Sequence, residues 1–294
     1  MTVVGFIGLG AMGAPMSGNL LKAGYEVWGH DLSPDAMAQF TARGGRAANT
    51  PAHLLEHADI VFTMLPTARH VHETYLGDEG IFAHATSRHL LLDSSTIGVG
   101  PALRLHEAAR ERGLRFLDAP VTGAVPAATA GTLVFIVGGR ADLAAEAEPV
   151  LLQMGKKAVH AGQAGQGQAI KICNNMAAGI IKGAICEAFV LGEKMGVDPK
   201  LFFEVASEGS AQSFALNVLC PVPGILPKAP SSHDYRNGFT TSLMHKDLML
   251  ACDAAAAVDA PVALARQAAE LFGDCAASGY GDLDNSVLYQ YLRR

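Results

Sequence analysis

The sequence predicts an α/β protein with a doubly wound, mostly parallel sheet, then a long linking helix and an all-helical C-terminal domain. The first observation is that short apolar runs alternate with helical segments over roughly the first 160 residues. Strands and helices that alternate in this way form parallel sheets through right-handed crossovers. The second observation is that strand signals then stop, and residues 167–195 contain no proline and carry apolar residues at helical spacing.

The predicted strands are short apolar runs bounded by glycine, proline or polar residues. They span residues 3–7, 26–29, 60–65, 90–92, 115–117 and 133–137. Two helix starts are also clear in this half. Ser33–Pro34 and Thr50–Pro51 each join an N-cap residue to a proline of the first turn, so we expect a helix to begin at each pair.

The helical half opens with a segment that would be on the order of 40 Å long as one helix. Gly179 and Gly183 lie about one turn apart in it and would let another helix approach closely. The later helices are predicted at 199–208, 211–219, 242–258 and 261–278. Residues 221–238 carry four prolines and form either a surface linker or a functional loop. The predicted domains are residues 1–163 and 164–294.

Composition excludes several function classes. The chain has 294 residues, half of them hydrophobic, and a net charge of −6. Acidic and basic residues are mixed along it, with no basic face for a phosphate backbone, so we expect no nucleic-acid partner. The five cysteines are odd in number and form no C-x-x-C pair, which argues against a disulfide framework.

No leader segment and no membrane span are expected. The chain opens at Met1–Thr2 and enters a strand at once, without the basic region of a signal peptide. The most apolar stretch, residues 170–191, is predicted to be too polar for a span because of Lys171, Asn174, Asn175, Lys182 and Glu187. We therefore expect a cytoplasmic protein.

A glycine-rich motif follows the first strand and opens a helix. Its residues form the fingerprint G-x-G-x-x-G: Gly8, Leu9, Gly10, Ala11, Met12 and Gly13. Gly8 permits the tight turn, Gly10 lets the backbone reach a pyrophosphate, and Gly13 lets the helix pack close to the strand. The helix N-terminus adds N–H groups that favour phosphate. These six residues are predicted to bind a dinucleotide.

Asp31 ends the second strand, eighteen residues after Gly13. A carboxylate at this position accepts hydrogen bonds from ribose hydroxyls and repels a 2′-phosphate. The next residues are Leu32 and Ser33, with no arginine to hold that phosphate. The sequence therefore favours NAD over NADP as coenzyme, although an ordinary loop aspartate would look the same.

Four stretches of the chain resemble the 3-hydroxyisobutyrate dehydrogenase, or β-hydroxyacid dehydrogenase, family. They are residues 6–16 (FIGLGAMGAPM), 118–123 (DAPVTG), 165–175 (GQGQAIKICNN) and 246–248 (KDL). They occur in the family's order over nearly the whole chain. The resemblance implies a Rossmann domain, a long linking helix and a helical second domain, which agrees with the pattern of strands and helices.

Lys171 is the residue most strongly predicted to be catalytic. A lysine beside the positive nicotinamide ring is pushed toward its neutral form and can take the alcohol proton as hydride leaves carbon. Asn175 lies four residues on, hence on the same helical face, where it can orient the lysine or the substrate. The alternative is a solvated lysine on an amphipathic helix.

The remaining site residues lie on loops and are implied mainly by the resemblance. Thr122, Gly123 and Ala124 would hold the substrate carboxylate, where the family usually has Ser-Gly-Gly, so Ala124 restricts the backbone. Leu65, Pro66 and Thr96 would contact the coenzyme. Ser95 and Phe239 would contact the substrate, and Lys246 would reach either one.

The resemblance implies NAD-dependent oxidation of 3-hydroxyisobutyrate to methylmalonate semialdehyde, a step of valine catabolism. Phe214 stands where that branch tends to have tryptophan, so the pocket is expected to differ. The alternatives are a relative that acts on tartronate semialdehyde and glycerate or on L-serine, and a non-catalytic NADH-binding protein. The family also implies a homodimer or homotetramer formed through the helical domain.

One competing motif points to metal chemistry. Residues 53–57 (HLLEH) fit H-x-x-E-H, an inverted zinc-protease motif, with His53 and His57 on one helical face. The motif begins a crossover helix and has no evident third ligand. We therefore predict no metal in the active site.

Overall fold

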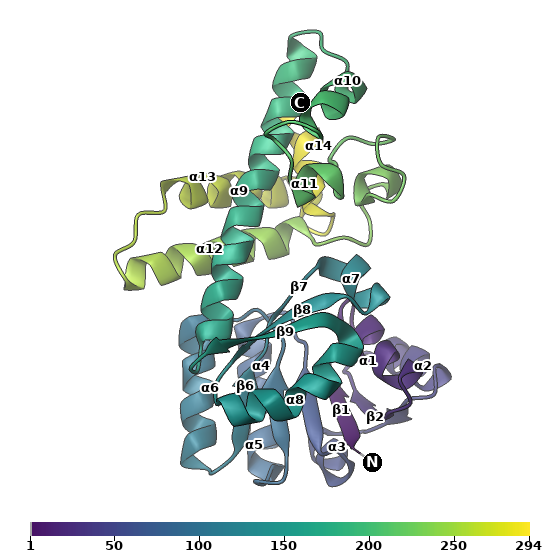
Figure 1. Cartoon of the computed structure of the whole chain (residues 1–294), viewed down its shortest axis with the longest axis vertical. Helices are drawn as coiled ribbons and strands as arrows, with labels where there is room; N and C mark the ends of the chain where they lie inside the picture. Colours follow the sequence, from purple (N-terminus) through teal and green to yellow (C-terminus); the bar gives the residue numbers. More distant parts are fainter. Residues whose placement is uncertain (1) are drawn as a thin grey trace. The chain divides into compact units, whose positions relative to one another are not determined.

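The computed structural model describes residues 2–294 (Figure 1). The chain divides into two compact units, Met1–Lys171 and Ile172–Arg294, called here the first and the second unit. The first unit holds a nine-stranded sheet with helices, whereas the second is helical. The predicted fold class is therefore confirmed.

The strands of the first unit are β1 (Val3–Ile7), β2 (Glu26–His30), β3 (Arg46–Ala47), β4 (Ile60–Thr63), β5 (Leu90–Asp93), β6 (Arg115–Asp118), β7 (Val121–Thr122), β8 (Leu133–Gly138) and β9 (Gly155–Gly162). Their order is β3-β2-β1-β4-β5-β6-β8-β7, and β9 pairs with β8. Pairing is parallel except where β8 meets β6 and β7. All six predicted strands are present. The prediction missed β3 and β7, which have two residues each, and also β9. The exposed Lys156 and Lys157 near the start of β9 leave it without a clear apolar pattern.

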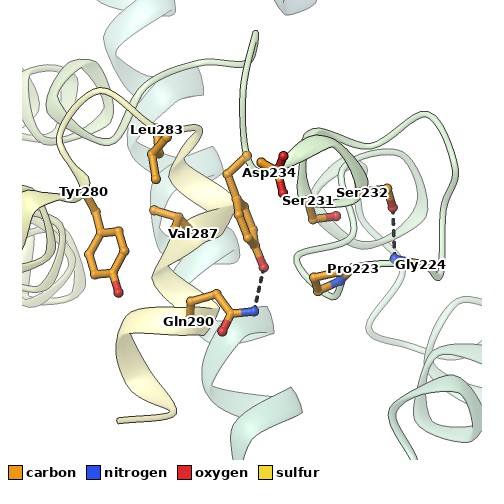
Figure 2. Close-up of a pocket in the computed structure, with 10 residues that line it drawn as sticks. Pro223, Gly224, Ser231, Ser232, Asp234, Tyr280, Leu283, Val287 and Gln290 are labelled. Atoms are coloured by element: carbon orange, nitrogen blue, oxygen red, sulfur yellow. Dashed lines mark hydrogen bonds between the residues drawn. The ribbon is translucent and has the colours of Figure 1, made fainter.

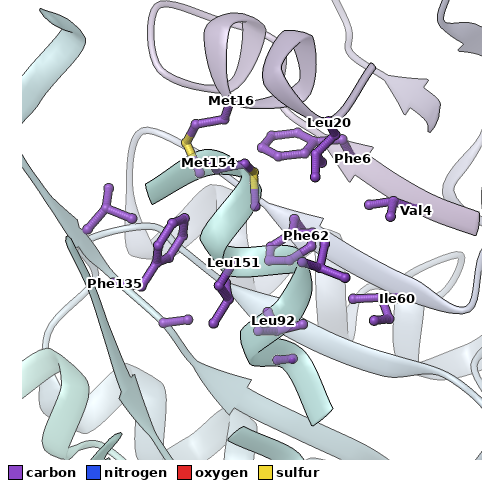
Figure 3. Close-up of a cluster of buried hydrophobic side chains, with 14 of the residues drawn as sticks. Val4, Phe6, Met16, Leu20, Ile60, Phe62, Leu92, Phe135, Leu151 and Met154 are labelled. Carbon is purple, nitrogen blue, oxygen red and sulfur yellow. The ribbon is translucent and has the colours of Figure 1, made fainter. Parts of the chain in front are cut away.

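Helices of the first unit cover both faces of the sheet. They are α1 (Gly13–Lys22), α2 (Pro34–Ala42), α3 (Pro51–His57), α4 (Ala68–Leu76), α5 (Ile81–His84), α6 (Val99–Glu111), α7 (Ala124–Ala130) and α8 (Ala141–Met154). The Ser33 and Thr50 hydroxyls cap α2 and α3 as predicted. One face is filled by a core that includes Phe6, Phe62 and Phe135 with α1 and α8 (Figure 3).

The second unit consists of helices and connecting loops. It contains most of α9 (Gln166–Lys194), then α10 (Pro199–Ala206), α11 (Phe214–Asn217), α12 (Thr241–Ala257), α13 (Ala263–Cys275) and α14 (Leu288–Leu292). Short 3₁₀ segments occur at Pro230–His233 and Asn285–Val287, and a π-helical turn at Ala276–Tyr280. The helix predicted at 211–219 is only four residues long, because Ser213 caps its start and Pro221 follows soon after.

Helix α9 is long and apolar enough to cross a membrane by length and composition alone, which corrects the expectation that this stretch is too polar. A core helix of a globular protein passes the same test. Ile185, Cys186 and Phe189 of α9 are buried in the core of the second unit. At Gly179 an added Cβ would lie 2.9 Å from Leu248 of α12, so the glycine permits the predicted close approach of another helix.

A buried lysine closes the end of α11. Lys182 is 2% exposed, and its Nζ donates to the Leu219 carbonyl at 2.7 Å and to the Ala215 carbonyl at 3.4 Å. Burial lowers the pKa of the Lys182 amine. Because the last carbonyls of a helix have no N–H donor within it, the Lys182 amine supplies donors for carbonyls at the end of α11 and attaches α11 to α9.

Candidate active site

The glycine motif lies where the strand order reverses. The chain passes from β1 to β2 and β3 on one side and returns to β4 on the other side of β1. Ligands of doubly wound sheets bind at this point, outside the carboxyl ends of the strands. Gly8 has φ +93°, and a Cβ there would lie 2.4 Å from the Met64 carbonyl oxygen, so the loops after β1 and β4 meet only because this residue is glycine.

The other two glycines of the motif have different roles. A Cβ on Gly13 would lie 1.8 Å from the Gly8 carbonyl oxygen, so α1 starts in direct contact with the turn. A Cβ on Gly10 would meet nothing within 4 Å, and Gly10 is exposed. The backbone at Gly10 is therefore open on the side where a pyrophosphate would approach, and the loop fits a dinucleotide.

Asp31 ties the end of β2 to this loop. Its Oδ2 accepts a hydrogen bond from the Leu9 N–H at 2.6 Å, and its Oδ1 accepts one from the Ser33 N–H at 2.8 Å. A carboxylate has about four acceptor positions, so two remain for other donors. Leu32 is 91% exposed, and no basic side chain follows Asp31 directly. This geometry is consistent with the predicted contact to a ribose.

A buried network connects the loops that follow β4 and β5. The Ser95 hydroxyl donates to Asp93 Oδ1 at 2.6 Å and accepts the Leu65 N–H at 2.8 Å. The Thr63 hydroxyl donates to the same Asp93 oxygen at 2.7 Å. Ser95 is fully buried, so its hydroxyl holds the two loops together. The predicted contact of Ser95 with substrate stays a prediction.

Asp93 is fully buried, and burial raises the pKa of its carboxyl group to about 6. Hydrogen bonds from Ser95 and Thr63 act in the opposite direction, because they favour the charged form. Among the described residues, Asp93 Oδ2 has no hydrogen-bond partner. The carboxylate is thus stabilised on one oxygen only.

Asp118 anchors the start of α9 to the end of β6. Its Oδ1 accepts the Gly165 N–H at 2.9 Å, and its Oδ2 accepts the Gln168 N–H at 3.0 Å. His106 Nε2 lies 2.7 Å from Oδ1. A Cβ on Gly167 would lie 2.6 Å from Oδ2, so the glycine lets the helix come close to the carboxylate.

Gln168 makes a second attachment of the same helix turn. It is fully buried, its Oε1 accepts the N–H groups of Ile97 and Gly98, and its Nε2 donates to the Ser95 carbonyl at 2.8 Å. Lys171 follows less than one turn later and is 8% exposed. The start of α9, Lys171 included, is therefore held in fixed relation to the loop after β5.

The predicted carboxylate loop has an unusual backbone. Gly123 has φ +128°, and Ala124, the first residue of α7, has φ +57°. This left-handed conformation costs alanine about 1 kcal/mol or more relative to glycine. The loop thus keeps the backbone path that a second glycine would favour, and the Ala124 methyl group adds bulk to it.

In the second unit, Asp247 links two predicted site residues. Asn175 Nδ2 donates to Asp247 Oδ2 at 2.5 Å, and Lys246 Nζ lies 3.2 Å from Oδ1. Asp247 is 2% exposed, whereas the Lys246 side chain is 26% exposed. The aspartate therefore fixes which way the Asn175 amide points. It belongs to the KDL stretch, but its role was not predicted.

Phe239 is held by the segment before α14. Its N–H donates to Asp284 Oδ2 at 2.9 Å, and its carbonyl accepts from the Asn285 side chain at 2.8 Å. Asp284 is 1% exposed, and a Cβ on Gly238 would lie 1.9 Å from its Oδ2. The sequence analysis assigned nothing to residues 279–294, so Asp284 and Asn285 were missed.

A hollow of about 540 Å³ in the second unit contains none of the predicted site residues. Gln290 Nε2 donates to the Tyr235 hydroxyl at 3.2 Å, and the Ser232 hydroxyl accepts the Gly224 N–H at 3.0 Å. Figure 2 shows Ser232, Gly224 and Gln290 around the hollow, with dashed lines for the hydrogen bonds. Burial raises the pKa of Tyr235 to about 12, so the phenol stays protonated. The hydroxyl groups of Ser231, Ser232 and Tyr235 donate to backbone carbonyls nearby, and we assign this hollow no role in catalysis.

Two family models together match almost the whole chain. Residues 3–162 match the NAD binding domain of 6-phosphogluconate dehydrogenase, and residues 165–292 match a model described as NAD-binding of NADP-dependent 3-hydroxyisobutyrate dehydrogenase. The chain is 47% identical over 272 residues to a 3-hydroxyisobutyrate dehydrogenase of Pseudomonas aeruginosa, covering 92% of this chain and 91% of the relative. This chain belongs to the 3-hydroxyisobutyrate dehydrogenase family.

This dehydrogenase is also similar to an L-serine dehydrogenase and to a solved structure of the family. It is 42% identical over 288 residues to an NAD-dependent L-serine dehydrogenase of Pseudomonas aeruginosa, covering 98% of this chain and 97% of the relative. A solved structure of Mycobacterium tuberculosis 3-hydroxyisobutyrate dehydrogenase with L-serine has a TM-score of 0.90 and 43% identity, covering 100% of both chains. The predicted oxidoreductase class and nicotinamide coenzyme are confirmed at the level of the family.

The predicted residues of this dehydrogenase fall into two groups. The first unit brings together the loops after β1, β4 and β5 with the start of α9, through hydrogen bonds of Asp31, Ser95, Asp118 and Gln168. The second unit groups Asn175 with Lys246 through Asp247, and holds Phe239 by Asp284. The individual roles of these residues stay predictions.

Proposed function

We propose that this chain oxidises the primary alcohol of a small 3-hydroxy acid with NAD, and that 3-hydroxyisobutyrate is its substrate. The observation that carries the proposal is the placement of Lys171. It is buried on the first turns of α9, directly after two anchors, Asp118 and Gln168, that attach this helix to the coenzyme edge of the sheet. The relatives named above support the substrate class.

When bound, the nicotinamide coenzyme accepts the hydride from the alcohol carbon. Lys171 takes the hydroxyl proton in the same reaction and returns it in the reverse direction. A lysine must be neutral to act as a base, and the positive charge of a bound nicotinamide ring beside it would favour that form. Asn175, one turn further along α9 and held by Asp247, orients the hydroxyl or the lysine.

The acid group of the substrate is assigned to the loop at residues 122–124. The Thr122 hydroxyl and the backbone N–H groups that follow it suit a carboxylate. The methyl group of Ala124 favours short substrates over long ones. Phe239 is proposed to offer the substrate an apolar surface, and Lys246 a positive charge.

NAD is the proposed coenzyme because of Asp31. A carboxylate at this position repels a 2′-phosphate, and the exposed Leu32 offers no compensating charge. The matched family models do not decide between the coenzymes, since one of them is described as NADP-dependent.

L-Serine is the second candidate substrate, because the chain is closely similar to an L-serine dehydrogenase and to a structure that contains L-serine. It shares the primary alcohol and the carboxylate with 3-hydroxyisobutyrate. The tartronate semialdehyde and glycerate pair has the same functional groups and remains an alternative.

We further propose a cytoplasmic homodimer or homotetramer assembled through the second unit. Large apolar side chains are exposed on its helices or next to them, including Leu191, Met195, Leu201, Val205 and Leu264. An interface between subunits would remove such side chains from water.

The test is a kinetic screen of purified enzyme against (R)- and (S)-3-hydroxyisobutyrate, L-serine, glycerate and a longer apolar 3-hydroxy acid. Each substrate is measured with NAD and with NADP. We expect the highest kcat/KM for one 3-hydroxyisobutyrate enantiomer with NAD. A higher kcat/KM for L-serine would select the second candidate, and NADH binding without turnover of any substrate would refute the enzymatic proposal.

A further inference from the structure

A cluster of metal-binding side chains lies on α3, on the first unit. His53, Glu56 and His57 each offer one ligand atom, and these atoms all lie within 4.8 Å of one another. The cluster is the H-x-x-E-H motif, which the sequence alone left without a third ligand. The structure supplies that ligand from within the motif, because Glu56 converges with the two histidines.

The spacing of these residues explains the convergence. Positions three and four apart on a helix face the same side, so one turn presents all three side chains together. A tetrahedral Zn²⁺ with bonds of about 2.1 Å needs its ligand atoms roughly 3.4 Å apart. Glu56 is exposed, so its side chain can rotate to close the remaining gap.

Trp28 of β2 holds the two histidine rings in place. The His57 ring stacks on the indole with centroids 3.9 Å apart and planes 10° from parallel. The His53 ring meets the indole edge-on at 5.4 Å. The indole is itself fixed, since Trp28 Nε1 donates to Glu26 Oε1 at 3.0 Å. Part of the entropy cost of ordering these ligands is therefore already met by the fold.

Few hydrogen bonds compete for the ligand atoms. The His53 Nδ1 accepts the Asn49 N–H at 3.5 Å, which is near the outer limit of a hydrogen bond. Arg46, the nearest cation to the indole, pairs with Glu26 at 3.3 Å. A divalent cation would thus meet two imidazoles and one carboxylate without having to displace a strong interaction.

We propose that His53, Glu56 and His57 bind one borderline divalent metal ion of the Zn²⁺, Ni²⁺ or Cu²⁺ type, with water completing its coordination. Two imidazoles and a carboxylate suit these ions, and Cu²⁺ is expected to bind most tightly. The site is separate from the coenzyme edge. His57 ends α3 three residues before β4 begins, at the opposite end of this strand from the loop that meets Gly8. This metal-binding proposal does not rest on the proposed dehydrogenase function.

The chain contains a single tryptophan, so its fluorescence reports on this site directly. The wild-type enzyme is titrated with Cu²⁺ in a non-chelating buffer, and Trp28 fluorescence should be quenched in one saturable step. His53→Ala and Glu56→Gln should weaken this binding at least about tenfold, since even supporting residues of metal sites have effects of that size. His84→Ala, which removes an exposed histidine paired with Glu79, is the control and should bind as the wild type does.

Thermal unfolding is an independent measurement and can also be applied to His57→Ala. This variant is unsuitable for the fluorescence titration, because the loss of the His57 ring changes Trp28 fluorescence by itself. Zn²⁺ should raise the Tm of the wild type and of His84→Ala but not that of the three ligand variants. NAD-dependent activity should be equal in all of them without added metal. Saturable quenching that is unchanged in His53→Ala and Glu56→Gln, or no quenching in the wild type, would overturn the proposal.

Discussion

Each unit contains a buried aspartate, Asp118 or Asp284, that accepts backbone N–H groups of a predicted functional segment, and the two differ in the segment that they hold. Asp118 accepts two N–H groups from the start of α9, the helix turn that precedes Lys171. Asp284 accepts the N–H of Phe239 and the N–H and hydroxyl of Ser286. In both cases a glycine, Gly167 or Gly238, allows the backbone to come within hydrogen-bonding distance of the carboxylate.

Because the two aspartates hold different segments, we expect them to affect different kinetic constants. Asp118 supports a proposed proton-transfer residue, so disturbing it should affect turnover. Asp284 supports a proposed apolar contact with the substrate, so disturbing it should affect KM. The same substitution at both positions can therefore separate the two contributions.

The largest effect is expected for Lys171→Ala. General acid–base catalysis is worth about 10²–10⁴-fold, so kcat should fall by at least about 10²-fold while the Kd for NAD stays near the wild-type value. Pre-steady-state hydride transfer and coenzyme fluorescence titration measure the two quantities. Lys194→Ala, at the exposed end of the same helix, is the control. Wild-type turnover with normal NAD binding would remove Lys171 from the mechanism.

Asp118→Asn should have the next largest effect. An amide cannot accept on both sides, so either Gly165 or Gln168 loses its acceptor, at a cost of about 1–3 kcal/mol in the free energy of unfolding. Because small displacements of a catalytic group reduce rates strongly, kcat should fall about ten- to a hundredfold. Denaturation and steady-state kinetics are the measurements. A lower stability with unchanged kcat would show that the anchor does not position Lys171.

Coenzyme preference should depend on the first unit alone. Asp31→Asn with Leu32→Arg keeps an acceptor for the Leu9 N–H, removes the negative charge and adds a positive one. The ratio of kcat/KM for NADP to that for NAD should rise about tenfold or more, since about 1.4 kcal/mol changes a ratio tenfold. The KM for the acid should change little. If the wild type already prefers NADP, the role given to Asp31 is wrong.

Asp284→Asn is the matched counterpart of Asp118→Asn. It should leave kcat within about twofold and raise the KM for the acid several-fold, because Phe239 loses its fixed position while the proton-transfer group does not. The free energy of unfolding should fall by about 1–3 kcal/mol, as for Asp118→Asn. A large fall in kcat with unchanged KM would contradict the division of roles between the two aspartates.

The smallest effect on turnover is expected for Asp93→Asn, which instead changes stability with pH. Burial raises the pKa of Asp93 from 3.8 to about 6. Between these values the folded state retains a proton that the unfolded chain releases, so this group lowers stability as pH rises and the full penalty is present above about pH 6. Asparagine keeps an acceptor for Thr63 and Ser95. From pH 4 to pH 6 the free energy of unfolding of Asp93→Asn should therefore fall less than that of the wild type. If both proteins show the same pH dependence, the raised pKa assigned to Asp93 is wrong.

Local patterns explain which features the sequence could predict. The glycine motif, the strands and the helix that carries Lys171 and Asn175 are each encoded within a few neighbouring residues. Asp247 and Asp284 act on residues 72 and 45 positions away, so no local spacing reveals their role. Gln168 likewise reaches the Ser95 carbonyl, 73 positions away. The segment before α14 has no apolar period because its buried side chains are mostly polar and serve as hydrogen-bond partners.

The boundary between the two units falls within α9, between Lys171 and Asn175, yet the helix runs through it without interruption. A continuous helix fixes the spacing of residues one turn apart by its own pitch. The backbone positions of the proposed proton acceptor, Lys171, and of Asn175 are therefore set relative to each other by the helix itself. While the helix stays intact, the base needs no realignment with this amide between one catalytic cycle and the next.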